Sequence, residues 1–220
     1  PSALSKRYEA FGFEFSKENH ILRKEYIQAY HACVSFIDAQ LGLVMDSLKK
    51  QGLWDDTIII FTSDHGYHLG DHFIWGKVTL FDIGSKVPFI VRAPGISKSG
   101  ANSEAMVELI DIYPTLADLA GLEAPIHLQG TSLRPLLGQP ERLGKRKYAY
   151  SVVTRGPQNL GYALRNQDWR YGKWPDGEEL YNLRNDPHEK KNLAQKEHLK
   201  EILDVFRKAL AKQQELIQQN

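Results

Sequence analysis

A short run of β-branched and aromatic side chains, Thr57 to Thr62, constrains the fold of this chain more than any other feature. Polar and apolar residues do not alternate along it, which is typical of a strand buried on both faces inside a parallel sheet. Ser63-Asp64-His65-Gly66 follows at once, so side chains that can bind a metal stand at the carboxyl end of the strand. Ligands of open α/β sheets bind outside that edge. We therefore predict an α/β fold with a functional site at Asp64 and His65.

Overall composition narrows the partners that this chain can have. Lysine and arginine number 28 against 27 acidic residues, and the net charge of +1 gives no reason to expect nucleic acid or an anionic membrane as a partner. No apolar run approaches the roughly 20 residues of a membrane span. Cys33 is the only cysteine, which excludes an internal disulfide and a thiolate zinc cluster.

A long helix is predicted before the central strand, from Lys17 to Lys50. Its apolar residues recur at three- and four-residue steps and so form one stripe. The members of this stripe are Tyr26, Tyr30, Cys33, Val34, Ile37, Leu41, Val44 and Leu48. Gly52 lies just past the stripe, where helices commonly end at a glycine. We expect the stripe to pack against the sheet, and nothing local places Asp38 or Gln40 in the cleft.

Two further elements are predicted after the central strand. Val87 to Val91 is typical of a second buried strand, closed by a turn at Ala93-Pro94-Gly95. A helix follows, with Pro114 in its first turn and Gly121 at its end. Asp111, just before this helix, is interpreted as a cap or local hydrogen-bond acceptor rather than as a ligand.

The carboxyl-terminal third of the chain changes character. We interpret 130–146 as a surface connection, with a solvated basic cluster at Lys145-Arg146-Lys147. Short aromatic runs separated by turns then predict an antiparallel meander with strands at 147–153, 161–165, 169–174 and 178–183. Leu199, Ile202, Leu203, Phe206 and Leu210 form the apolar face of a final covering helix. We therefore divide the chain into part of an α/β domain, 1–145, and a small sheet-plus-helix subdomain, 146–220.

Asp64 and His65 offer a hard carboxylate and an imidazole, which neighbouring residues in extended geometry can direct onto one metal ion. Two ligands are too few for any metal, so others must come from elsewhere. His65, His68 and His72 would suggest zinc if they shared one helix. The glycines between them disfavour such a helix.

Lys77 has two interpretations that spacing alone does not separate. It follows Trp75 and Gly76, shortly after the Asp-His pair. It is either a solvated surface cation or a point charge that meets an oxyanion at the strand edge, a role that suits a compact ammonium group.

Motifs spread over most of the chain fall in the order found in one known family. They begin with Ser63-Asp64-His65-Gly66, Leu69-Gly70-Asp71-His72 and Trp75-Gly76-Lys77. The others are Tyr30 to Gly42, Val87 to Gly95, Asp111 to Leu116, and Glu179 to Leu183 with Asp186-Pro187. Together they resemble the type I sulfatases of the alkaline-phosphatase superfamily, over about Glu25 to Leu193. The Asp-His pair, where many arylsulfatases have Asp-Asn, is similar to the iduronate-sulfatase branch.

This resemblance implies a fold and a set of roles. The fold would be part of an alkaline-phosphatase-like mixed or parallel sheet with flanking helices, plus a small antiparallel sheet covered by one helix. Asp64 and His65 would coordinate a divalent cation, usually Ca²⁺. Lys77 would contact the sulfate ester and steady the leaving oxygen, and His68 and His72 would line the substrate pocket.

The nucleophile of the family is a formylglycine made from the cysteine of a Cys-x-Pro-x-Arg motif. Cys33 is followed by Val34 and Ser35, so the motif is absent from this sequence, as are the paired aspartates of the family's amino-terminal part and the histidine of its middle segment. The resemblance therefore implies the carboxyl-terminal half of a sulfatase that acts on a sulfated small molecule or glycan, incomplete and inactive without its amino-terminal half. Such enzymes are periplasmic, secreted or lysosomal. The alternatives are a phosphodiesterase or phosphonate monoester hydrolase of the same superfamily, and a non-catalytic binding module.

Overall fold

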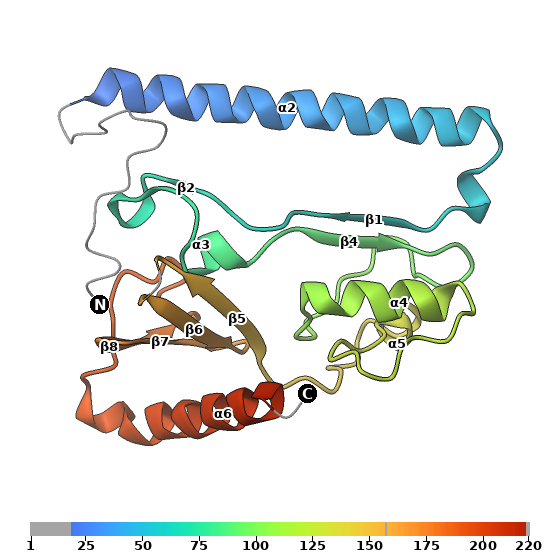
Figure 1. Ribbon diagram of the computed structural model, residues 1–220. Helices are drawn as coiled ribbons and strands as arrows, with labels where there is room; N and C mark the ends of the chain where they lie inside the picture. Colours follow the sequence, from blue (N-terminus) through green and yellow to red (C-terminus); the bar gives the residue numbers. More distant parts are fainter. Residues whose placement is uncertain (1–18, 157, 219–220) are drawn as a thin grey trace.

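The computed structural model describes residues 19–156 and 158–218 (Figure 1). Helix α2 spans His20–Lys50, and the side chain of Asn19 caps it by accepting a hydrogen bond of 3.1 Å from the amide of Leu22. The predicted start at Lys17 lies outside the described residues. The predicted end is confirmed, because Gly52 has a φ of 70° and its amide donates to the carbonyl of Lys49. Glycine adopts this left-handed conformation without steric cost.

The apolar stripe of α2 is not packed into a core, which corrects the sequence-based expectation. None of its residues is buried, and Val34, Ile37 and Val44 are each more than half exposed. The helix lies along one side of the molecule (Figure 1). Aromatic rings near its beginning contact the rest of the molecule. Tyr26 packs edge-on against Trp75, and its hydroxyl lies 2.6 Å from that of Tyr67. Tyr30 also packs on Tyr67, and Leu41 and Leu48 are half-buried, whereas Cys33, Val34, Ile37 and Val44 are exposed.

The central strand is present as β1 (Ile59–Thr62), and the second strand as β4 (Phe89–Arg92). The two pair antiparallel with each other, in the register Ile59 to Arg92. All residues of β1 are half-buried. The expected burial on both faces of a parallel sheet is therefore not found in the described part of the chain, because β1 has β4 as its one neighbouring strand there.

The connection between these strands holds several short elements. They are β2 (His68–Leu69), the 3₁₀ turn η2 (Asp71–Phe73), β3 (Trp75–Gly76) and the short helix α3 (Asp82–Ser85). Strands β2 and β3 pair antiparallel, which folds the segment back on itself. The chain has two further 3₁₀ turns. One, η1 (Trp54–Asp56), precedes β1, and the other, η4 (Glu197–Leu199), leads into the final helix.

Helix α4 (Ile112–Leu119) confirms the predicted helix, and Asp111 before it is the predicted hydrogen-bond acceptor. Asp111 ends the 3₁₀ turn η3 (Leu109–Asp111), is fully buried, and accepts hydrogen bonds from the amides of Glu108 and Thr131. The expected surface connection contains helix α5 (Arg134–Gly138). Its basic cluster is also not simply solvated, because Arg146 donates to both carboxylate oxygens of Asp111 at 2.5 and 2.9 Å. No local pattern predicted a partner for Arg146, since the Asp111 carboxylate lies 35 residues earlier in the chain.

The carboxyl-terminal meander and its covering helix are confirmed. Strands β5 (Ala149–Thr154), β6 (Leu160–Arg165), β7 (Trp169–Trp174) and β8 (Gly177–Asn182) form one antiparallel sheet in chain order. Helix α6 (Lys200–Gln218) lies across it (Figure 1). Their shared core consists of Leu164, Tyr171, Leu180, Leu203, Phe206 and Leu210. No described helix is both long and apolar enough to cross a membrane. The division of the chain at residue 145 stays a prediction.

Candidate active site

Asp64 and His65 lie directly after β1 and point toward a common position. Oδ2 of Asp64 and Nε2 of His65 are 3.3 Å apart. The other carboxylate oxygen, Oδ1, accepts a hydrogen bond of 3.0 Å from the amide of His65. On the far side of the imidazole, Nδ1 lies 2.9 Å from the carbonyl oxygen of Gly66. A carbonyl only accepts, so Nδ1 carries a proton and Nε2 is the ring nitrogen that faces Asp64. Metal-binding histidines are commonly oriented in this way.

The surroundings keep the Asp64 carboxylate ionised. Desolvation raises its pKa, but the charge of His65, the His65 amide and the charge of Lys77 outweigh this effect and lower the pKa below its ordinary value. Asp64 is solvent-exposed, so the carboxylate is available to a ligand. An ionised, accessible carboxylate beside an imidazole is a suitable part of a cation site.

Lys77 faces the same cleft as the Asp-His pair. The cleft has a volume of about 2300 Å³, and Asp64, His65, Lys77 and Asp38 all line it. Lys77 is exposed and lies next to Val78, whose φ of 68° is rare for a β-branched residue. The structure therefore brings three of the predicted site residues together, and it adds Asp38, for which the sequence offered no local signal.

His68 and His72, predicted to line the substrate pocket, are placed elsewhere. His68 is fully buried between Asp71 and Thr79. The Asp71 carbonyl lies 3.2 Å from Nδ1, so Nε2 accepts a hydrogen bond of 2.7 Å from the Thr79 hydroxyl. Desolvation lowers the pKa of His68 to about 4, and the ring is neutral near pH 7. In this arrangement His68 has no surface left for a substrate.

His72 packs against the core beside the site. Its ring is stacked on Phe81 with the centroids 3.8 Å apart, and desolvation lowers its pKa. Both His72 and Phe73 have positive φ values, of 55° and 59°. Such pairs of left-handed non-glycine residues are uncommon and are frequent at functional loops.

The three-histidine zinc site is not formed. His65 follows β1, His68 is on β2 and His72 is in η2, and no cluster of three or more metal-binding side chains occurs among residues 19–156 and 158–218. Asp64 and His65 alone fit part of a divalent cation site. Calcium takes roughly six to eight oxygen ligands, so most of a calcium shell would have to come from other groups.

One buried group beside the site was missed by sequence reasoning. Glu189 accepts a hydrogen bond of 2.7 Å from the amide of Asp82, in the segment that follows Lys77. Its one sequence signal is its place two residues after the Asp186-Pro187 motif. No local pattern indicates that a glutamate there reaches a residue 107 positions earlier.

Comparison with known proteins identifies the fold and the family. The mixed α/β architecture, with a small antiparallel sheet and a terminal helix, matches solved structures of the alkaline-phosphatase-like fold and confirms the predicted fold class. The sulfatase family model matches residues 1–122, more than half of the chain, and the model for the carboxyl-terminal part of N-sulphoglucosamine sulphohydrolase matches residues 70–216. The chain therefore belongs to the sulfatase family.

Individual relatives agree with this assignment. A sulfatase of Formosa agariphila is 37% identical over 86% of this chain and 36% of its own length. A structure of a protein bound to its substrate D-glucosamine-2-N,6-O-disulfate has a TM-score of 0.85 and 30% identity, over 90% of this chain and 42% of that one. The phosphonate monoester hydrolase of Agrobacterium radiobacter has a TM-score of 0.76 and 31% identity, over 81% and 39%.

These matches cover part of each relative and do not identify a branch of the family. The chain spans about two fifths of the length of the relatives that it matches. The iduronate-sulfatase branch is not singled out by any of these matches, so that finer resemblance stays an expectation.

Proposed function

We propose that this chain is the carboxyl-terminal portion of an enzyme that hydrolyses sulfate esters. The observation that carries the proposal is the convergence of Asp64, His65 and Lys77 on one cleft at the carboxyl end of β1. Family membership supports the same reaction class. In this role Asp64 and His65 supply part of a divalent cation site, with Ca²⁺ as the expected ion, and Lys77 contacts the sulfate ester.

The chemistry of the step explains why a lysine is needed. Hydrolysis of a sulfate ester moves negative charge onto the bridging oxygen, so a fixed cation there lowers the barrier more than it tightens binding of the substrate. A bound cation would further neutralise the sulfate oxygens. Tying His65 Nδ1 to the Gly66 carbonyl fixes the ring, so little reorganisation is needed when a charged ligand arrives.

The nucleophile would come from an amino-terminal half of the same enzyme, as a formylglycine. Two features of the structure support such a partner. The stripe of α2 is exposed, although apolar faces of this size are normally covered. The cleft is also far larger than the roughly 300 to 1,000 Å³ of a small-molecule pocket, and apolar residues of β1 and β4 are among those that line it. Both features fit surfaces that another part of an enzyme fills.

The proposed substrate is a sulfated sugar or glycan. The support is the solved structure whose substrate is D-glucosamine-2-N,6-O-disulfate and which this chain matches over 90% of its length. A phosphonate monoester hydrolase activity is the second candidate, because a structure of that class is equally similar in sequence. The non-catalytic binding module remains the third.

The test uses the enzyme in which this chain follows a segment with the Cys-x-Pro-x-Arg motif. Purified enzyme is assayed with calcium on glucosamine sulfates, on an aryl sulfate and on a phosphonate monoester. We expect release of sulfate and slower turnover of the phosphonate. Preferred turnover of the phosphonate would establish the second candidate, and no turnover of any ester would leave a binding module. Calorimetric titration of the chain alone should show calcium binding no tighter than about millimolar, because it offers few ligands.

A further inference from the structure

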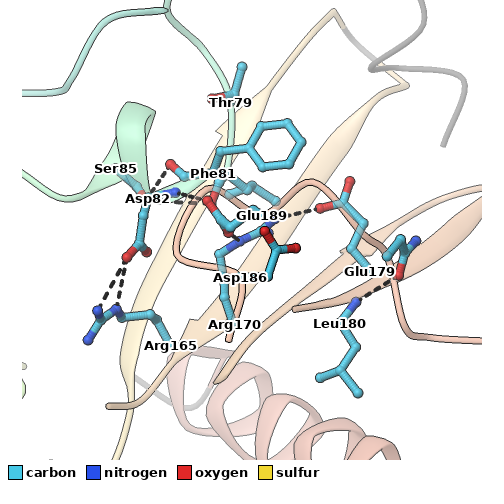
Figure 2. A network of polar contacts seen from close by, with 12 residues as sticks. Thr79, Phe81, Asp82, Ser85, Arg165, Arg170, Glu179, Leu180, Asp186 and Glu189 are labelled. Carbon is cyan, nitrogen blue, oxygen red and sulfur yellow. Dashed lines mark hydrogen bonds and ion pairs between the residues drawn. The ribbon is translucent and has the colours of Figure 1, made fainter. Parts of the chain in front are cut away.

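We propose that Glu189 is a positioning residue for the active site and that it acts through the segment Thr79–Ser85 on His65 and Lys77. This inference rests on the proposed function, because it assigns Glu189 a part in the same reaction. Figure 2 shows the polar network that carries it. Glu189 itself lies in the loop after β8, in the carboxyl-terminal part of the chain, and is outside the cleft lining.

The Glu189 carboxylate joins two parts of the molecule. One oxygen, Oε1, accepts a hydrogen bond from Nε of Arg170 on β7, and the other, Oε2, accepts from the amide of Asp82 at 2.7 Å. The side chain is 2% exposed, and the backbone has a φ of 53°, which is uncommon for a residue other than glycine. A buried carboxylate with two donors, held by an unfavourable backbone angle, is a specific constraint rather than a chance surface contact.

Arg170 holds the Glu189 carboxylate in a fixed position. Its Nη2 donates to Glu179 at 2.9 Å, and its guanidinium carbon lies 4.9 Å from the ring centre of Phe81 and 4.7 Å from that of Tyr181. The side chain is 1% exposed. A planar guanidinium with one carboxylate at each edge and aromatic rings nearby has little freedom to turn. Glu189 therefore presents a rigid acceptor to Asp82.

Asp82 transmits this constraint to the metal-binding pair. It begins α3, and within α3 the carbonyl of Gly84 accepts a hydrogen bond of 3.0 Å from the amide of Gly66. The carbonyl of Gly66 in turn accepts from Nδ1 of His65. Hydrogen bonds and one short helix thus lead from Glu189 to the imidazole that we propose as a ligand.

The segment Thr79–Ser85 also fixes the backbone that follows Lys77. Thr79, two residues later, is held by the buried His68. Leu80 packs with Trp174 of the carboxyl-terminal sheet, and Phe81 lies beneath Arg170. Asp82 is also paired with Arg165 of β6 at 3.2 Å. The chain that leaves Lys77 is therefore seated on the carboxyl-terminal sheet, and release of Asp82 would free both site elements.

The first test measures amide hydrogen exchange in the 220-residue chain. Glu189→Gln keeps the shape of the side chain but replaces one acceptor oxygen by a donor. We expect exchange in 64–66 and 77–85 to rise on the order of tenfold, as loss of a hydrogen bond to a charged group allows. The control is Glu178→Gln on the same sheet, whose partner Arg207 is on α6. It should raise exchange in α6 and leave 64–66 and 77–85 unchanged.

The second test measures kinetics in the whole enzyme. Glu189→Gln should lower kcat roughly 10- to 100-fold, the effect of small misplacement of catalytic groups, with a smaller change in KM. Glu178→Gln should leave both constants unchanged. Wild-type kcat and wild-type exchange in Glu189→Gln would overturn the inference. Faster exchange in an enzyme without sulfate ester hydrolysis would contradict the proposed function and leave the positioning contact established.

A less disruptive substitution serves as the test if Glu189→Gln does not fold. Asp82→Asn weakens the pair with Arg165 at the partly exposed edge of the network and keeps the Asp82 amide. It should raise exchange in 64–66 and 77–85 by a smaller factor, in the same direction. Unchanged exchange in both segments would contradict the proposed route from the carboxyl-terminal sheet to the site.

Discussion

The amide of Gly66, one residue after His65, donates a hydrogen bond of 3.0 Å to the carbonyl of Gly84. The two backbones are so close that a Cβ at Gly66 would collide with the carbonyl of Ile83. This contact ties the loop of the Asp-His pair to the segment that follows Lys77. The cleft therefore owes its shape to a backbone approach that only glycine permits.

Gly66→Ala should destabilise the chain by about 1–3 kcal/mol, the range for an added methyl group in a packed site. It should also weaken calcium binding, since the collision moves the Gly66 carbonyl that orients His65. Urea denaturation measures the free energy of unfolding. The matched control is Gly42→Ala in α2, where a Cβ has open space. Replacing a mid-helix glycine should stabilise by about 0.5–1 kcal/mol. Equal stability of Gly66→Ala and wild type would refute the close approach.

Asp111→Ala should lower the free energy of unfolding by roughly 3–5 kcal/mol, the usual result of breaking a buried ion pair. The change leaves the amides of Glu108 and Thr131 without this acceptor and takes from Arg146 one carboxylate partner, while its pair with Glu108 at 3.2 Å remains. Asp55→Ala is the control, because Asp55 is 91% exposed and its pair with Arg92 is a surface contact. Its cost should stay within about 1 kcal/mol. Similar costs for the two variants would show that Asp111 does not anchor this region.

The free energy of unfolding should decrease at acidic pH because Glu178 becomes protonated. Hydrogen bonds from Arg207 lower its pKa to about 2, from an ordinary value of 4.5. The folded protein therefore keeps the carboxylate charged where the unfolded chain takes up a proton, and this contribution is complete above pH 4.5 and is lost as the pH falls toward 2. The Tm difference between wild type and Glu178→Gln should be constant down to about pH 5 and shrink below it. A difference that stays constant to about pH 3 would argue against the pair.

Local patterns explain how much of this molecule the sequence could predict. The ends of α2 and α4 followed from Gly52 and Gly121, both of which have positive φ values. The meander followed from its turns, and the Asp-His site from its place after a strand. Each of these signals lies within a few residues.

The remaining features depend on contacts between distant segments. The exposure of α2 and the antiparallel pairing of β1 depend on which elements cover them, and periodicity carries no such information. Arg146 was interpreted as part of a solvated cluster because its partner Asp111 is 35 residues away, and no pattern indicated that Glu189 contacts Asp82, 107 residues earlier. The family resemblance implied a pocket role for His68, and no local pattern indicated its contact with Thr79, across a folded loop, where the ring is buried.

The most direct test of the account is kcat of Lys77→Ala in the enzyme that contains this chain and a Cys-x-Pro-x-Arg segment. Loss of a cation that stabilises charge in the transition state should lower kcat on the order of 10²- to 10³-fold, with a smaller change in KM. Lys77→Arg should rescue poorly, because a planar guanidinium does not replace a compact ammonium. Lys212→Ala on α6 serves as the control. Wild-type kcat in Lys77→Ala would make Lys77 a surface charge and contradict the proposed site.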